Sequence, residues 1–204
     1  MKTKPKFSGP ELCRLEAHTV VSMLKAGDVS TAELIDAAML RISKTGPFIN
    51  ATPTLCKERA LGVTLNLNEN DHAGWLAGLP ISIKDLNTVA GVRTTFGTKG
   101  FADFIPEESD PLVERLEARG GVVLGKTNTP EFGAGGNTFN DVFGATLNPW
   151  NTKLNPGGSS GGAAASLAAG EIWLSHGSDH GGSLRTPAAY CGIVGLRPSP
   201  GIAG

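Results

Sequence analysis

The sequence has few of the residues that build metal sites and disulfides. Its 204 residues include four histidines and three cysteines, and Cys13, Cys56 and Cys191 show neither a CxxC pair nor metal-ligand spacing. We therefore expect no metal site and no disulfide framework. An odd number of widely separated cysteines is typical of reduced thiols, so we expect a cytoplasmic protein.

Long apolar runs and a strong net charge are also missing. No run of 18 apolar residues occurs, and no apolar segment follows the basic N-terminal residues, so neither a transmembrane helix nor a secretory signal is expected. The formal net charge is −1. A nearly neutral chain argues against direct nucleic-acid binding, which needs a basic surface.

Glycine, in contrast, is abundant, with 28 of the 204 residues, about twice the average share. Two Gly-Gly-Ser clusters, at 157–159 and 181–183, flank a run of small residues at 163–169. Because glycine lets a backbone or a ligand approach closely, the paired clusters favour a binding or catalytic site over ordinary turns.

Hydrophobic periodicity predicts helices in the first part of the chain and alternating strands and helices after residue 74. Ser30 and Glu33 fit a capping box, and Gly46-Pro47 is expected to end the helix that follows them. This pattern predicts an α/β fold with an N-terminal helical region, residues 1–73, and a core, residues 74–204. Predicted helices cover 19–26, 55–67, 110–119 and 163–169, and predicted strands cover 79–84, 121–125, 172–176 and 192–196.

Two short motifs suggest other functions, but their context does not fit. Residues 120–127 match the phosphate-loop pattern GxxxxGK[ST], yet Val-Val-Leu within them favours a strand rather than a loop. Residues 157–161 match the GxSxG nucleophile elbow, but the polar segment 151–156 replaces the strand that must precede it. The elbow also needs an acid and then a histidine downstream, and only His176 and His180 follow, both close by.

The remaining chemistry consists of serines in glycine-rich loops and Lys84 at the end of an apolar strand. A serine nucleophile needs a base, and a lysine can serve if its amine is neutral. Burial lowers the pKa of a lysine and favours the neutral amine. The alternative for Lys84 is a salt bridge, for example to Asp85.

Several uncommon motifs resemble the amidase signature family in both order and spacing. The resemblance covers about residues 10–204 and is strongest from residue 79 onward. It implies an α/β/α layered sandwich around a mixed β-sheet, and hydrolysis of a small-molecule carboxamide without a metal or organic cofactor. The segments that carry it are 80–85, 125–128, 148–150, 156–162, 177–183 and 192–196.

The resemblance also implies a Ser–cis-Ser–Lys catalytic triad. Ser183 would be the nucleophile that forms an acyl-enzyme. Ser159, on a cis or strained peptide, would carry a proton from Ser183 to Lys84, the terminal base. Ser160 would be a supporting hydrogen-bond partner.

The same resemblance implies the surroundings of this triad. The backbone N–H groups of His180, Gly181, Gly182 and Ser183 would form the oxyanion hole, and Gly133 would lie in a substrate-lining loop. A histidine at position 180 departs from the small or β-branched residue usual in the family, but the expected role needs only its backbone.

The family's domain extends well beyond the length of this chain. We therefore expect that the second half of the domain is absent, and that the chain alone is a weak or inactive amidase. The alternatives are a glutaminase-type subunit, similar to the amidase-type subunit of tRNA-dependent amidotransferases, and a non-catalytic fragment. A homodimer or a complex with a partner subunit is expected, whereas membrane contact is not.

Overall fold

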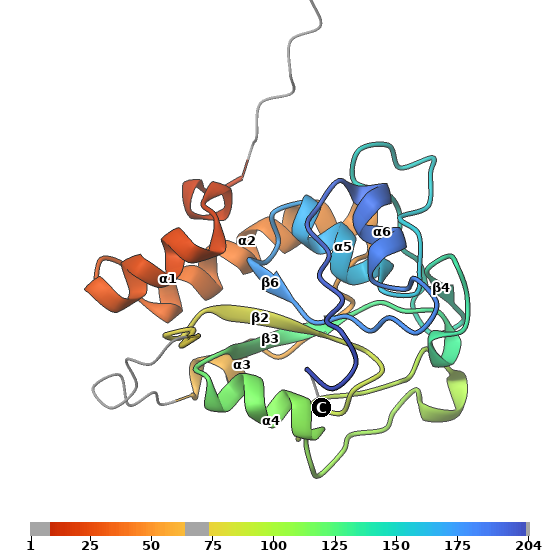
Figure 1. Cartoon of the computed structure of the whole chain (residues 1–204), viewed down its shortest axis with the longest axis horizontal. Helices are drawn as coiled ribbons and strands as arrows, with labels where there is room; N and C mark the ends of the chain where they lie inside the picture. The colour runs from red at the N-terminus through yellow and green to blue at the C-terminus, as the bar shows by residue number, and fades with distance from the viewer. Residues whose placement is uncertain (1–8, 64–73, 203–204) are drawn as a thin grey trace, which may run out of the picture.

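The computed structural model describes residues 9–63 and 74–202, in which a four-stranded sheet organises the fold (Figure 1). The central pair is parallel, a second parallel neighbour joins on one side, and an antiparallel strand joins on the other. The sheet is therefore mixed, as predicted. Its strands, in spatial order, are β1 (Thr54–Leu55), β3 (Val122–Thr127), β2 (Pro80–Lys84) and β6 (Leu174–Ser175).

Helices cover both faces of this sheet, which confirms the layered α/β architecture (Figure 1). Successive residues of β3 point to opposite faces. Val122 and Leu124 pack in a cluster with Ile35 of α2, whereas Val123 packs in another cluster with Val113 of α4. The helices are α1 (Ala17–Ala26), α2 (Thr31–Ile49), α3 (Lys57–Leu61), α4 (Pro111–Ala118), α5 (Gly161–Ala168) and α6 (Arg185–Cys191). Short 3-10 turns η1 (Glu11–Arg14), η2 (Lys99–Phe101) and η3 (Glu131–Gly133), and a small hairpin of β4 (Phe139–Asn140) and β5 (Gly144–Ala145), complete the described elements.

The regions 1–73 and 74–204, distinguished from the sequence, contribute to one core. Val20 of α1 and Leu34 of α2 lie in the same buried cluster as Ile81 and Val123 of the sheet. The first region also supplies β1, a strand that the sequence analysis did not predict.

The start of α2 follows the prediction, but its end does not. Ser30 caps the helix through the Glu33 N–H at 3.2 Å, and the Glu33 carboxylate accepts the Ser30 N–H at 2.8 Å, which confirms the capping box. The prediction that Gly46-Pro47 ends the helix is wrong, since α2 continues to Ile49 with Pro47 inside it. Asn50 ends it instead in a left-handed conformation, which asparagine tolerates.

Most predicted elements of the core are present, with one clear exception. The strands at 79–84 and 121–125 and the helix at 110–119 form close to their predicted bounds, and residues 174–175 pair with β2. The prediction of a strand at 192–196 is wrong: α6 ends just before Gly192, and Val194 and Leu196 are highly exposed. No described strand lies beside them, and a strand forms only where its backbone groups find partners. The predicted helix at 55–67 is reduced to α3, and residues 64–67 lie outside the described part.

None of the helices within the described residues is long and apolar enough to span a membrane. Over the same residues, no group of three or more histidine, cysteine or acidic side chains is placed to hold a metal ion. The three cysteines are free, and burial raises the pKa of each thiol to about 11.

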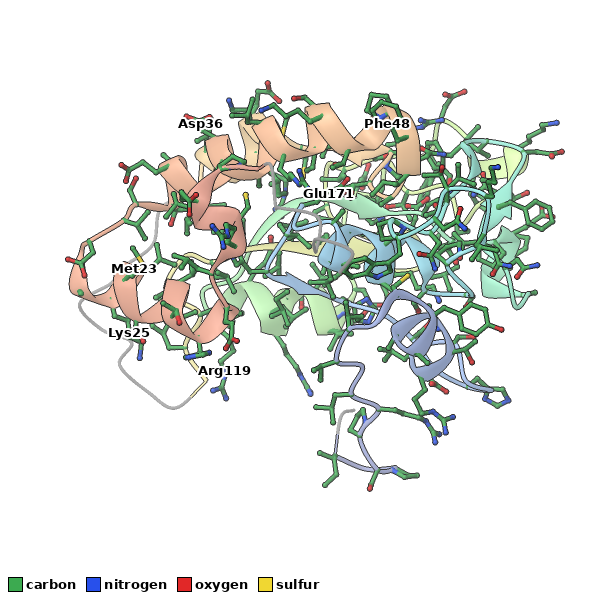
Figure 2. All side chains as sticks on the ribbon, turned by 90° about the horizontal axis from the view of Figure 1, so that it is seen from above. Met23, Lys25, Asp36, Phe48, Arg119 and Glu171 are labelled. Carbon is green, nitrogen blue, oxygen red and sulfur yellow. The ribbon has the colours of Figure 1, made fainter. Side chains whose placement is uncertain are left out.

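One buried carboxyl group joins the N-terminal helices to the core. Glu171 lies beneath α2 (Figure 2) and is 1% exposed. It accepts hydrogen bonds from the hydroxyls of Thr45 and Thr52 at 2.6 and 3.0 Å. Burial raises its pKa from 4.5 to about 7, against the smaller effects of these hydrogen bonds and of nearby Arg41.

This raised pKa predicts a specific pH dependence of stability. The neutral carboxyl is favoured in the fold, so the contribution of Glu171 is complete below pH 4.5 and is lost as the pH rises through 7. We expect Glu171→Gln, which cannot ionise, to gain about 3 kcal/mol over the wild type at pH 8 and less than about 1 kcal/mol at pH 5. Urea unfolding at both pH values measures this difference, with Glu107→Gln, at an exposed position, as the control. An equal difference at both pH values would contradict it.

Candidate active site

Lys84 is delivered to the interior by the last position of β2. Ile81 and Ile83 of this strand pack into one apolar cluster, so strand alternation directs Ser82 and Lys84 to the other face, toward α5. Lys84 is fully buried. An apolar strand therefore places an amine where water does not reach it.

Three serine hydroxyls surround this amine. Lys84 Nζ lies 2.7 Å from Ser159 Oγ, 2.9 Å from Ser160 Oγ and 2.9 Å from Ser178 Oγ. Burial lowers the pKa of Lys84 from 10.5 to about 7, and the opposing effect of Asp179 is smaller. A substantial fraction of the amine is therefore neutral near pH 7 and able to accept a proton.

Lys84 and Asp85 do not form the salt bridge that the sequence left as an alternative. Asp85 pairs instead with Lys126 of β3, with 2.9 Å between carboxylate and ammonium, and both side chains are buried. Thr95 donates to the same carboxylate at 2.6 Å, and Lys126 also contacts Thr94 Oγ1 at 2.8 Å. Lys126, the lysine of the phosphate-loop match, therefore sits within a strand as part of the core.

Ser159 stands at an unusual point of the backbone. Its peptide bond with Gly158 is cis, the geometry expected from the family resemblance. Gly133 lies beside it: a Cβ on that glycine would be 3.6 Å from Ser159 Oγ and 2.5 Å from a methyl carbon of Leu86. Gly133 also has φ +69°, a conformation that disfavours any side chain. The structure thus brings the predicted loop glycine next to Ser159.

Ser183 lies on the adjoining loop and is half-buried. Its carbonyl accepts the N–H of Ser160 at 3.0 Å, which ties its segment to the serine loop before α5. Within the described residues the Ser183 hydroxyl itself has no hydrogen bond. Lys84 therefore contacts the Ser159 hydroxyl directly, whereas Ser183 is held next to the serine loop by the hydrogen bond of its backbone carbonyl.

The loop that carries Ser183 is organised around one carboxylate. Asp179, whose side chain is 1% exposed, accepts the N–H groups of Gly182, Leu184 and Arg185 at 2.8, 3.1 and 3.2 Å. The Arg185 guanidinium donates two more hydrogen bonds, at 3.0 and 3.1 Å. The Arg185 side chain, followed by these N–H groups, lowers the pKa of Asp179 well below its usual range.

This arrangement decides which oxyanion donors are available. The N–H of Gly182, one of the predicted donors, is already bonded to Asp179. The N–H groups of His180, Gly181 and Ser183 have no partner in the part of the chain that the structure describes. Three of the four predicted donors are therefore open to a ligand.

We expect Asp179→Ala to impair this loop. The change leaves three backbone N–H groups without their acceptor and so loosens the loop that carries the predicted oxyanion donors. For the hydrolysis that the family resemblance implies, we expect kcat to fall by about 10²-fold, the typical cost of losing one such donor. Because Asp179 raises the pKa of Lys84, the acid limb of the pH–rate profile should also move to lower pH.

The matched control is Asp36→Ala, which removes an exposed carboxylate paired with Lys57. Steady-state kinetics from pH 5 to 9 measure both effects. Equal rates in the Asp179 and Asp36 variants would contradict this role of the Asp179 carboxylate.

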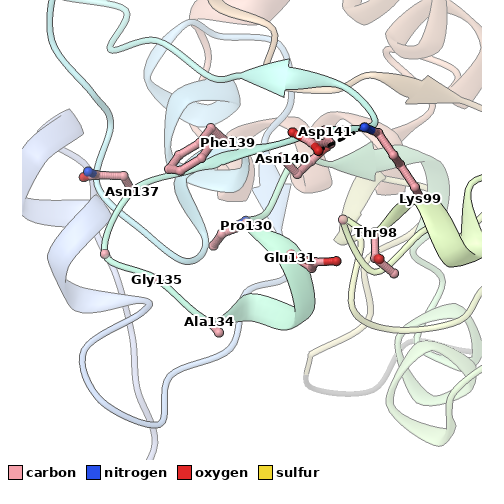
Figure 3. A pocket seen from close by; sticks show the side chains of 12 residues that line it. Thr98, Lys99, Pro130, Glu131, Ala134, Gly135, Asn137, Phe139, Asn140 and Asp141 are labelled. Carbon is pink, nitrogen blue, oxygen red and sulfur yellow. Dashed lines mark hydrogen bonds and ion pairs between the residues drawn. The ribbon is translucent and has the colours of Figure 1, made fainter.

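A pocket of about 450 Å³ opens beside the Gly133 loop (Figure 3). It is lined by residues 134–137, by Phe139 and by the Lys99–Asp141 ion pair, which spans 3.0 Å. Lys84, Ser159 and Ser183 do not line it. The pocket is therefore a neighbour of the serine cluster and not its centre.

Sequence reasoning missed the parts played by Ser178 and Asp179. Both lie inside the 177–183 segment that carries the family resemblance. Asp179 is also one of two charged residues between 155 and 183, with Glu171 as the other. An isolated charge in a neutral, glycine-dense stretch was a usable signal, because such a charge needs partners when it is buried.

The chain is similar to proteins of known family over most of its length. The family model described as Amidase matches residues 33–203. One subunit of the glutamyl-tRNA(Gln) amidotransferase of Synechococcus sp. (strain CC9605) is 46% identical over 182 residues, which is 87% of this chain and 37% of the relative. The same subunit of Carboxydothermus hydrogenoformans (strain ATCC BAA-161 / DSM 6008 / Z-2901) is 44% identical over 195 residues, 94% of this chain and 40% of the relative.

Solved structures show the same fold. A 6-aminohexanoate cyclic dimer hydrolase complexed with substrate aligns with a TM-score of 0.81 at 33% identity, over 90% of this chain and 37% of the other. A bacterial aryl acylamidase aligns with a TM-score of 0.78 at 31% identity, over 86% of this chain and 37% of the other. The chain thus spans roughly two fifths of the length of these proteins.

Proposed function

Because the chain belongs to the amidase family, we propose that it takes part in the hydrolysis of a carboxamide C–N bond through a serine acyl-enzyme. Ser183 is the nucleophile, Ser159 the bridging hydroxyl and Lys84 the base. The observation that carries this proposal is the buried Lys84 amine, 2.7 Å from Ser159 Oγ. A buried amine with a pKa of about 7 can accept a proton at neutral pH.

The proposed proton path starts from the contact between Ser159 and Lys84 and extends it to Ser183 on the adjoining loop. Ser183 Oγ attacks the amide carbon while its proton moves to Ser159, whose own proton moves to Lys84. The proton returns along the same path to the leaving nitrogen, the C–N bond breaks, and ammonia or an amine departs. Water then attacks the Ser183 ester with the same groups as base, which releases the acid and restores the enzyme.

The backbone supports the charge that develops on the amide oxygen. The free N–H groups of His180, Gly181 and Ser183 are the donors that we assign to this oxyanion. A lost donor of this type typically costs about 10²–10³ in rate. Gly133 leaves room beside Ser159 for the substrate.

The test is amide hydrolysis by the purified chain and its Ser183→Ala variant, on simple aliphatic and aryl amides. We expect the variant to lose at least about 10³-fold in kcat. An active-site serine reagent should label the wild type at Ser183 and leave the variant unlabelled. Near-wild-type turnover by Ser183→Ala would refute the assignment, and the wild-type rate tests the expectation that the chain alone is weakly active.

A second function is favoured by the relatives themselves. Those that are 41–46% identical are the same subunit of glutamyl-tRNA(Gln) amidotransferases from several organisms. The same three residues would then release ammonia from glutamine for a partner subunit. Ammonia release from glutamine, with and without partner subunits, compared with release from simple amides, separates the two functions.

A further inference from the structure

The hydroxyl of Ser178 touches the amine of Lys84 but has no part in the proton path above. It lies 2.9 Å from Lys84 Nζ and comes from the loop that follows β6. Ser159 and Ser160, the other two hydroxyls, come from the loop before α5. Two separate segments of the chain therefore meet at one nitrogen.

The role of Ser160 is fixed by its other hydrogen bonds. A serine hydroxyl has one proton to donate and two lone pairs to accept with. Ser160 Oγ donates to the carbonyl of Ser178 at 3.1 Å and accepts the Ser178 N–H at 3.2 Å. Since its proton is already used, Ser160 can only accept from Lys84.

The hydroxyls of Ser159 and Ser178 bind the other N–H group and the lone pair of the neutral Lys84 amine. A neutral lysine amine carries two N–H groups and one lone pair, and Ser160 takes one N–H. If Ser178 accepts the second N–H, the lone pair points at Ser159. If Ser178 donated instead, an N–H would point at Ser159, and the proton of Ser159 could not move to Lys84.

We propose that Ser178 is a positioning residue, which accepts an N–H of Lys84 and thereby directs the amine lone pair at Ser159. The catalytic consequence rests on the proposed function, whereas the hydrogen bond itself does not. Ser178 acts through Lys84 and does not contact the reacting atoms.

The charged groups near Lys84 set the background for this effect. Asp179 raises the pKa of Lys84. His176 follows β6, and burial, followed by the charge of Lys84, lowers its pKa to about 4, so it stays neutral. Asp85 is held by Lys126. Against this background, losing one hydroxyl acceptor removes a partner of the ammonium form and lowers the pKa of Lys84.

The experiment compares Ser178→Ala, Ser178→Thr and Ser178→Val with Ser175→Ala. Ser175 is a matched control, since its hydroxyl accepts from Ser82 at 2.7 Å and has no hydrogen bond with Lys84. The first readout is the NMR titration of the Lys84 side chain, assigned with Lys84→Arg. We expect the midpoint to fall by at least about 0.5 pH unit in the alanine and valine variants and to stay at the wild-type value in the others.

The second readout is kinetic. With a simple amide, Ser178→Ala should lose about tenfold in kcat with little change in KM, and its acid limb should shift with the titration. Ser178→Thr should restore both. The threonine and valine variants have the same shape and differ only in the hydroxyl, so this pair decides the question even if the alanine variant does not fold.

Each outcome is decisive. An unchanged Lys84 midpoint in Ser178→Val, or a shift that Ser178→Thr shares, overturns the positioning role. If the wild type hydrolyses neither simple amides nor glutamine, the proposed function fails, while the titration still decides the role of Ser178.

Discussion

Lys84→Arg is expected to abolish amide hydrolysis, with a loss of at least about 10³-fold in kcat. Arginine keeps the positive charge and can still donate to serine hydroxyls. Its guanidinium stays protonated at every accessible pH, so it cannot accept the proton of Ser159. The substitution therefore separates the base function of Lys84 from a purely electrostatic one.

The pH dependence of the wild-type rate also tests whether Lys84 is the base. Only the neutral amine accepts a proton, so kcat should rise with pH and level off above the Lys84 pKa of about 7. Below that pKa the rate should fall by about tenfold per pH unit. Lys84→Arg should show no such limb.

Steady-state rates on one amide from pH 5 to 9, with circular dichroism to confirm folding, make this measurement. Lys153→Arg, on the exposed surface, is the control and should keep the wild-type profile. Retention of more than about one tenth of the wild-type kcat by Lys84→Arg would be inconsistent with a lysine base.

Lys84 and Ser159 could be selected from the sequence because each has a local signature. An apolar run ending in a charged residue predicts a buried lysine at the end of a strand. Serines between glycines predict a loop that a ligand can approach. Both signatures are readable over a few residues, and the family resemblance then assigned them to one site.

The partners of these residues were not readable in the same way. Asp85 follows Lys84 directly, so a pairing of the two was a reasonable alternative. Strand geometry sends consecutive residues to opposite faces, so Asp85 instead meets Lys126, 41 positions away on the neighbouring strand. Such a pairing depends on strand order and register, and neither is written in a local pattern.

The same limit explains the element that was predicted wrongly. Residues 192–196 have the composition of a strand, and their pattern contains nothing that says whether a neighbour exists. In the described fold the sheet ends at β6, and this segment leaves Val194 and Leu196 exposed. Propensity therefore sets what a segment can form, and the surrounding structure decides whether it does.

The pair of Asp85 and Lys126 carries the second large prediction, which concerns stability. The side chains of Lys126 and Asp85 are at most 1% exposed. Asp85→Ala therefore leaves the ammonium of Lys126 buried, with the hydroxyl of Thr94 as its remaining partner. Removing one member of a buried pair typically costs about 3–5 kcal/mol. We expect a loss of this size in the free energy of unfolding, measured with urea at pH 7.

A double variant distinguishes the lost charge partner from lost packing. Lys126→Met with Asp85→Ala removes both charges, so no unpaired charge remains inside the protein. Because replacing a whole buried pair by apolar groups is often neutral, the double variant should be more stable than Asp85→Ala alone. If instead the losses in unfolding free energy of Asp85→Ala and of Lys126→Met alone add up in the double variant, the charge pair does not stabilise the end of β2. The ordinary packing of two buried side chains would then hold Lys84 in position.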